Sequence, residues 1–157
     1  SWTDRGEVAD VLTRYEGWHP MVRGLIEAFP ETYIWALHDR DQLPQWSDGR
    51  VTLLGDACHP MLPMMAQGAA QAIEDGAALA SLLAATPDDV PGALQRYEAV
   101  RKPRASRLQE LSRANRVRFH LPDGPEQEKR DEAMRNVGDR SLANIAWLYE
   151  HDSAVVT

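Results

Sequence analysis

The residues whose types could do chemistry gather in one run, Gly49 to Leu83. A short apolar stretch, Val51–Leu54, leads into Gly55 and Asp56. A glycine at that point permits close backbone approach, and the carboxylate after it can accept a hydrogen bond from a hydroxyl group, for example of a sugar alcohol. A loop with two prolines follows, and a helix begins near Gly68, where exposed amides and the helix dipole favour negative charge. The run therefore predicts a site for a ligand with hydroxyl groups and an anionic end.

Other side chains of this region have a functional and a structural interpretation. His59 is a candidate catalytic base or metal ligand, but a loop histidine beside a proline is more often structural. The GDACH stretch has no second histidine or acid at metal-ligand spacing, so no metal site is expected. We expect Cys58 to be a small buried residue rather than a nucleophile. For the Glu74–Asp75 pair, a structural role, either solvated or pairing with another helix, and a functional role are equally open. The basic run Arg101–Arg104 is interpreted as a solvated helix face.

The elements expected up to Leu54 are two helices and two strands. The sequence predicts a short helix within residues 6–15 and a second from Pro20, with Pro30 ending it. Residues Thr32–His38 are rich in β-branched and aromatic types and predict a strand. Residues Val51–Leu54 lie between turn signals and predict a buried strand.

Helices dominate the rest of the chain. One is predicted from Gly68 to about Ala85, with small residues on one side. Asp88 or Asp89 caps the next, which continues to about Arg118 and which Pro103 should kink or break. Two more helices follow, the last with four inward residues: Leu142, Ile145, Ala146 and Tyr149. Two isolated strands rarely make a stable sheet, so the fold class is predicted as α/β, in the form of a mainly helical piece of a larger protein.

Composition excludes several classes of protein. The chain has 157 residues, 43% of them hydrophobic and 26% charged, which is typical of a globular domain. A net charge of −7 without a long basic run argues against nucleic acid and anionic membranes as partners. A single cysteine suits a reducing cytoplasm. No apolar stretch reaches the length of about 20 residues that spans a bilayer. Because the chain begins without Met, we expect it to lie inside a longer protein.

The run from Gly49 to Leu83 resembles the second flavin motif of the single-component FAD-dependent aromatic hydroxylases, the group that includes salicylate, 3-hydroxybenzoate and 6-hydroxynicotinate hydroxylases. Their pattern is approximately GDAxHxxxP, then a GQGA-like turn and a helix with an E-D pair. The flanking strings LHDRDQLPQW, YEAVRKPRA and WLYEHD also look like this family, so the resemblance covers nearly the whole chain. The matching residues are Gly55-Asp56-Ala57, His59-Pro60, Pro63, Gln67-Gly68-Ala69 and Glu74-Asp75.

The resemblance implies FAD as the cofactor and NADH or NADPH as the co-substrate. It also implies that O2 forms a flavin C4a-hydroperoxide, which hydroxylates a small, electron-rich aromatic substrate. Asp56, directly after Gly55, would hydrogen-bond the ribityl chain of FAD. Pro63 would lie in the loop beside the isoalloxazine ring, and the amides of Gly68 and Ala69 would face the pyrimidine end of the flavin.

Two departures from the family pattern matter. Ala70 stands where many relatives carry Asn, so only backbone amides are expected to act there. The dinucleotide motif GxGxxG, the ribose-binding acid and the middle DG motif are absent, and Gly6, Gly17 and Gly24 do not supply the spacing. The sequence of this chain therefore shows no binding motif for the ADP half of FAD. We expect the chain to be inactive alone and to need a missing N-terminal FAD-binding portion.

By the same resemblance, residues 1–40 are the end of a substrate-binding domain, 41–100 the C-terminal part of an FAD-binding domain of the p-hydroxybenzoate-hydroxylase-like fold, and 101–157 C-terminal helices. Two alternatives remain, a flavoprotein of the same fold with halogenase or epoxidase chemistry, and a non-catalytic helical interaction module. The HPMLP loop and the WLYEHD ending favour the hydroxylase. An upstream GxGxxG in the same reading frame would argue against the module. No residue is assigned as catalytic, and a homo-oligomer stays open.

Overall fold

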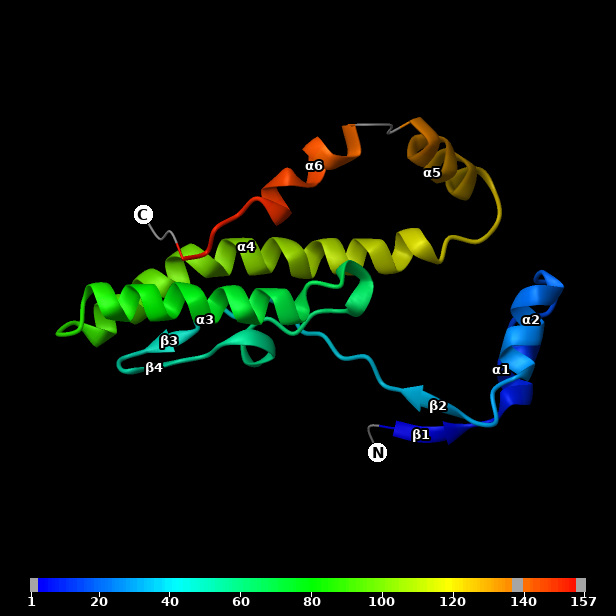
Figure 1. Ribbon diagram of the computed structural model, residues 1–157, viewed down its shortest axis with the longest axis horizontal. Helices are drawn as coiled ribbons and strands as arrows, with labels where there is room; N and C mark the ends of the chain where they lie inside the picture. Colours follow the sequence, from blue (N-terminus) through cyan, green and yellow to red (C-terminus); the bar gives the residue numbers. More distant parts are fainter. Residues whose placement is uncertain (1–2, 137–139, 155–157) are drawn as a thin grey trace. The chain divides into compact units, whose positions relative to one another are not determined.

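The computed structural model describes residues 3–136 and 140–154 and divides the chain into two compact units, Ser1–Leu37 and His38–Thr157 (Figure 1). The described residues are mainly helical with a few short strands, which confirms the predicted fold class. The division falls close to residue 40, the predicted end of the substrate-binding domain. The assignment of the three predicted segments to domains stays a prediction.

The first unit is an antiparallel strand pair with two helices between its strands. Strand β1 (Thr3–Gly6) pairs with β2 (Thr32–Trp35), and α1 (Val8–Arg14) and α2 (Pro20–Glu27) lie between them in sequence. The second strand is shorter than the predicted Thr32–His38. The first was not predicted, because its residues TDRG show no apolar alternation.

The second unit starts with a hairpin that leads to the candidate site. Strand β3 (Ser47–Asp48) pairs antiparallel with β4 (Val51–Thr52), and Gly49 takes a φ of +56° in the tight turn between them. The predicted buried strand Val51–Leu54 is therefore wrong in length and burial, since Val51 is 68% exposed. Burial of both faces needs a larger sheet covered by other elements on each face, and among the described residues β4 pairs only with β3.

Two long helices form the body of this unit. Helix α3 (Gly68–Ala85) begins and ends as predicted, and it runs beside α4 (Val90–Phe119) (Figure 1). Asp89 caps α4, because its Oδ1 accepts a hydrogen bond of 2.9 Å from the Gly92 N–H. Small side chains let the helices pack closely, and the hydrophobic core comprises Trp46, Cys58, Ala78, Leu82, Ala93, Tyr97 and Ala105.

Pro103 does not break α4, contrary to the sequence prediction. A proline inside a helix removes one backbone hydrogen bond and crowds the preceding turn, so other contacts must hold the helix together. Arg101 and Arg104 supply such contacts on either side of it, because both guanidinium groups are paired with carboxylates of α3.

Two further helices, α5 (Pro125–Asn136) and α6 (Arg140–Tyr149), follow α4 as predicted. The inward face of α6 was predicted wrongly, since Ile145 and Tyr149 are exposed and Leu148 is the buried residue. The side chain of Leu142 lies outside the described residues. Within the part of the chain that the structure describes, no helix combines the length and apolar character that crossing a membrane requires.

Candidate functional site

The turn that follows β4 depends on a glycine. Gly55 is buried and has a φ of +60°, and a Cβ at this position would stand 3.1 Å from the Cβ of Ala72 on α3. Other residues rarely adopt this backbone conformation, and the neighbouring side chain leaves little room for a larger one. The chain continues through the 3-10 helix η1 (Gly55–Ala57), which leaves Asp56 exposed.

A groove of about 610 Å³ opens beside this turn. Its walls come from the η1 turn, from the 3-10 helix η2 (Pro63–Met65) and from the first turn of α3. The groove brings together all the residues that the sequence predicted as cofactor-binding, namely Gly55, Asp56, Pro63, Gly68 and Ala69. Their role toward flavin stays a prediction, but they border one common space.

The loop along this groove has a strained backbone. Pro63 opens η2, and Ala66 ends it with a φ of +53°. Among the described residues, Ala66 is the one non-glycine residue with a positive φ. A left-handed alanine costs about 1–2 kcal/mol, and such conformations are frequent where a loop is shaped for a ligand.

The start of α3 and the carboxylate of Asp56 face the same space. The N-cap residue of α3, Gln67, makes no side-chain capping hydrogen bond, so the first amides of the helix keep their capacity to donate. Asp56 Oδ1 lies 3.9 Å from the position that a Cβ on Gly68 would take. Within residues 3–136 and 140–154, the Asp56 side chain accepts no hydrogen bond. A ligand with hydroxyl groups could donate to this carboxylate and place an electron-rich end at the helix start.

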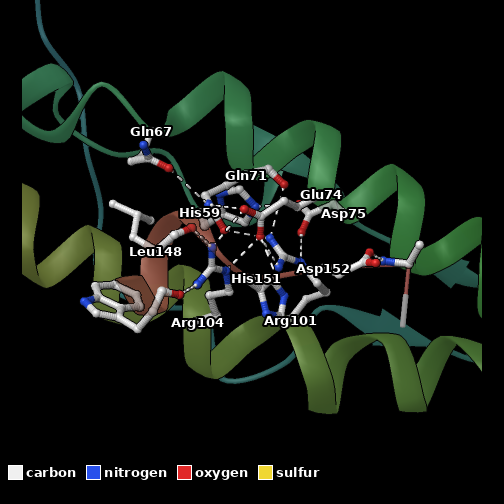
Figure 2. A network of polar contacts seen from close by, with 12 residues as sticks. His59, Gln67, Gln71, Glu74, Asp75, Arg101, Arg104, Leu148, His151 and Asp152 are labelled. Carbon is white, nitrogen blue, oxygen red and sulfur yellow. Dashed lines mark hydrogen bonds and ion pairs between the residues drawn. The ribbon is translucent and has the colours of Figure 1, made fainter. Parts of the chain in front are cut away.

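A buried polar network lies directly behind the turn (Figure 2). Oδ2 of Asp75 accepts hydrogen bonds from the Gly55 N–H at 3.0 Å and from His59 Nε2 at 2.6 Å. Oδ1 of Asp75 accepts one from Arg101 Nε at 2.8 Å. The side chains of Asp75, His59 and Arg101 are fully buried. His59 does not line the groove.

The network continues from α3 to the end of α6. Glu74 pairs with Arg101 at 2.6 Å and with Arg104 at 2.8 Å. Arg104 also donates to the backbone carbonyls of Trp147 and Leu148, each at 2.8 Å, which satisfies acceptors at the C-terminal end of α6. One connected set of charges therefore joins the turn after β4 to the C-terminal helix.

Both acids of the network are held in their ionised form. Burial alone would raise the pKa of Asp75, but the hydrogen bonds from His59, Arg101 and the Gly55 N–H outweigh it and lower that pKa. Burial likewise opposes the charge of Glu74, and the hydrogen bonds from Arg104 and Arg101 lower its pKa. The negative charges thus stay matched to the two guanidinium groups.

This network corrects two interpretations from the sequence. The run Arg101–Arg104 is not a solvated helix face, because Arg101 is fully buried and the side chain of Arg104 is 10% exposed. Asp75 is not solvated either, and it takes the helix-pairing role that the sequence left open. The signal was the helical spacing of a buried stripe on α4, which consists of Leu94, Tyr97, Arg101, Ala105 and Leu108.

Potential metal ligands do meet here, although the sequence shows no second histidine or acid at metal-ligand spacing around His59. One ligand atom each of Cys58, His59 and Asp75 lie within 4.8 Å of one another. The oxygens of Asp75 are already engaged by three hydrogen bonds, and Cys58 Sγ donates to the Gly55 carbonyl at 3.3 Å. These contacts describe an ion pair rather than a metal centre.

The chemistry of Cys58 gives a testable expectation. Burial, with the negative charge of Asp75, raises the pKa of its thiol to about 12. The native full-length protein should therefore resist alkylation of Cys58 by iodoacetamide at about pH 8, whereas the denatured protein should react readily. Mass spectrometry of the peptide that contains Cys58 measures the difference. Equal labelling of native and denatured protein would show that this thiol is neither buried nor held protonated.

Comparison with known proteins shows the family of this chain. The sequence model of the family described as "FAD binding domain" matches residues 22–112, more than half of the chain. The chain is 43% identical over 155 residues to the 3-amino-4-hydroxybenzoate 2-monooxygenase PtmB3 of Streptomyces platensis, which covers 99% of this chain and 39% of that protein. It is 51% identical over 116 residues to the 6-hydroxynicotinate 3-monooxygenase of Bordetella bronchiseptica, covering 73% of this chain and 30% of that protein.

Solved structures of hydroxylases and FAD complexes are also similar to this chain. A substrate complex of salicylate hydroxylase superposes with a TM-score of 0.82 at 31% identity, over 99% of this chain and 39% of that one. The structure of CtdE in complex with FAD and its substrate 4 superposes with a TM-score of 0.77 at 31% identity, over 98% of this chain and 37% of that one. The chain thus spans about 39% of the length of relatives that are named as monooxygenases. On the match over residues 22–112, this chain belongs to the FAD-binding-domain family.

Proposed function

We propose that the groove beside Gly55 and Asp56 holds the flavin end of FAD in a longer, FAD-dependent aromatic monooxygenase. The whole enzyme would use NADH or NADPH and O2 to hydroxylate a phenolic or hydroxypyridine-like ring. The substrates in the names of two relatives, 3-amino-4-hydroxybenzoate and 6-hydroxynicotinate, support this substrate class. Bound FAD supplies the redox and oxygen-activating chemistry, and the residues of this chain bind and orient it.

One observation carries the proposal. The Asp56 carboxylate has no hydrogen-bond partner among the described residues and lies next to the uncapped start of α3. The ribityl chain of FAD offers hydroxyl donors to such a carboxylate, and the pyrimidine end of the flavin offers acceptors to the amides of Gly68 and Ala69. Gly55 keeps the backbone close to this space, because a larger residue would meet Ala72. The residues present therefore fit the flavin half of the cofactor.

The ADP half fits less well, since the chain has no GxGxxG motif for the pyrophosphate. We propose that a preceding portion of the full-length protein binds this half. On that proposal, the isolated chain does not hold FAD at stoichiometry and is inactive alone.

Asp56→Ala in the full-length protein tests the proposal. The substitution removes a charged acceptor from a ribityl hydroxyl, and a hydrogen bond to a charged group contributes about 1.5–3 kcal/mol. We expect FAD affinity to fall by about ten- to hundred-fold. Titration of the apoprotein with FAD, followed by quenching of flavin fluorescence, measures the change.

Asp88→Ala is the matched control, because Asp88 is also an exposed aspartate but lies at the far end of α3, outside the groove. Its FAD affinity should equal that of the wild type. Unchanged affinity in Asp56→Ala would remove Asp56 from the cofactor site. A separate assay identifies the co-substrate and the aromatic substrate: the oxidation of NADH and of NADPH by the full-length protein is measured with a series of hydroxybenzoates and hydroxypyridines.

A further inference from the structure

Asp75 accepts a hydrogen bond from the backbone N–H of the residue that precedes Asp56. Its Oδ2 lies 3.0 Å from the Gly55 nitrogen, and this N–H begins the η1 turn. Gly55 has a φ of +60°, and a Cβ added to it would lie 3.1 Å from the Cβ of Ala72, so the turn has an uncommon backbone conformation with little room for a side chain. A hydrogen bond from a buried N–H to a charged carboxylate is stronger than one to a neutral acceptor, and it stabilises such a conformation.

The carboxylate of Asp75 is itself held from two sides. His59 Nε2 donates to Oδ2 at 2.6 Å, and Arg101 Nε donates to Oδ1 at 2.8 Å. Arg101 is oriented in turn by Gln71, whose side-chain oxygen accepts a hydrogen bond of 2.7 Å from it, and by Glu74 (Figure 2). Because these side chains are buried or nearly so, the position of the carboxylate relative to the Gly55 N–H is closely defined.

We propose that Asp75 is a positioning residue for the flavin: by fixing the Gly55 N–H, it sets the direction in which Asp56 offers its carboxylate to the groove. This inference rests on the proposed function. Asp75 does not line the groove, so it acts through the turn and not by touching the ligand. His59 and Arg101 support it by keeping the carboxylate ionised and oriented.

The neighbouring acid offers a matched control. Glu74 lies on the same helix and pairs with Arg101 at 2.6 Å and Arg104 at 2.8 Å, but it makes no hydrogen bond to the turn. Glu74→Gln removes a charge from the same network but keeps a side-chain oxygen that can accept from Arg101. It leaves the hydrogen bonds of Asp75 with Arg101 Nε and with the Gly55 N–H in place. A purely structural role of the network predicts similar effects of Glu74→Gln and Asp75→Asn on flavin binding. A positioning role predicts an effect of Asp75→Asn alone.

The experiment measures FAD affinity and the visible absorption spectrum of bound FAD in the full-length protein. It compares the wild type, Asp75→Asn, Glu74→Gln, Asp56→Ala and the double variant Asp56→Ala/Asp75→Asn. We expect Asp75→Asn to weaken FAD binding by about ten-fold and to shift the flavin bands. Glu74→Gln should leave affinity and spectrum near those of the wild type, even if it lowers the melting temperature.

The double variant tests whether Asp75 acts through Asp56. If it does, Asp56→Ala has little further effect once Asp75 is replaced, and the two losses are not additive. Additive losses, or equal flavin effects of Asp75→Asn and Glu74→Gln, would overturn the positioning role while leaving the proposed function intact. An Asp56→Ala variant with wild-type affinity would overturn the proposed function and this inference with it.

Asp75→Glu covers the case in which Asp75→Asn does not fold. It keeps the charge for Arg101, but its longer side chain shifts the carboxylate away from the Gly55 N–H. We expect a similar loss of about ten-fold in FAD affinity and the same spectral shift. Wild-type affinity in Asp75→Glu would show that the hydrogen bond to Gly55 does not position the flavin.

Discussion

Replacement of Arg101 by methionine is expected to lower the free energy of unfolding of the full-length protein by about 3–5 kcal/mol. Arg101 is fully buried, and it pairs with Asp75 at 2.8 Å and with Glu74 at 2.6 Å. Methionine fills a similar volume but removes the positive charge that pairs with two carboxylates. Buried carboxylates without a paired positive charge destabilise the folded state. Denaturation in urea, followed by circular dichroism, measures the loss.

Lys102→Met is the control for this effect. Lys102 is the next residue of α4, and it pairs with Glu98 at 3.2 Å, but its side chain is 25% exposed and it does not contact the network. A change of about 1 kcal/mol or less is expected for it. If Arg101→Met were no more destabilising than Lys102→Met, the network would not be the buried, connected structure described above.

The same variant should change the acid sensitivity of the protein. The pKa values of Glu74 and Asp75 lie below their ordinary values of 4.5 and 3.8. A carboxylate whose pKa is lowered by folding stabilises the fold above its unfolded-state pKa, and this contribution is lost as the pH falls through the lowered value. The wild type should thus lose this stability below about pH 4, and Arg101→Met, with smaller shifts, should lose less of it.

Gly68→Val is expected to affect the flavin rather than the fold. A Cβ on Gly68 would point toward Asp56 Oδ1 at 3.9 Å and Met61 Cγ at 3.8 Å, so the branches of valine would extend into the groove. We expect FAD affinity to fall by about ten- to hundred-fold, as for an overpacked site. Flavin that still binds should lie further from the amides at the start of α3, so these amides would stabilise the negative charge of the reduced ring less. The bound flavin should therefore have a lower reduction potential and be reduced more slowly by NAD(P)H.

Gly76→Val separates this effect from a general effect of valine in α3. A Cβ on Gly76 would meet nothing within 4 Å, and Gly76 does not line the groove. Its flavin potential and reduction rate should equal those of the wild type. A Gly68→Val variant with the parent's affinity, potential and reduction rate would mean that the amides of Gly68 and Ala69 do not face the ring.

Much of this structure follows from local sequence patterns. Helix α3 was predicted from Gly68 to about Ala85, and the structure confirms these bounds. The row of small residues does not mark its packed face, because the buried residues of the helix are Gln71, Asp75, Ala78 and Leu82. The grouping of Gly55, Asp56, Pro63, Gly68 and Ala69 around one groove also followed from the motif. Strands of two residues were beyond prediction, since a pair such as Ser47–Asp48 is too short to show a period.

The buried charges could not be predicted from local composition. A run of basic residues is usually solvated, and nothing near Arg101 in sequence shows that Asp75 will face it across two packed helices. The same long-range pairing explains why α4 continues through Pro103, since contacts to α3 on both sides of the proline keep the segment helical. Tertiary contacts here override local preferences.

A crystal structure of the full-length protein with FAD bound tests the central claim most directly. The account predicts an oxygen of Asp56 at about 2.5–3.0 Å from a ribityl hydroxyl, with the N–H groups of Gly68 and Ala69 directed at the pyrimidine end of the flavin. It also predicts that Asp75 still accepts the Gly55 N–H behind the turn. A flavin that lies outside the groove, with Asp56 in contact only with solvent, would contradict it.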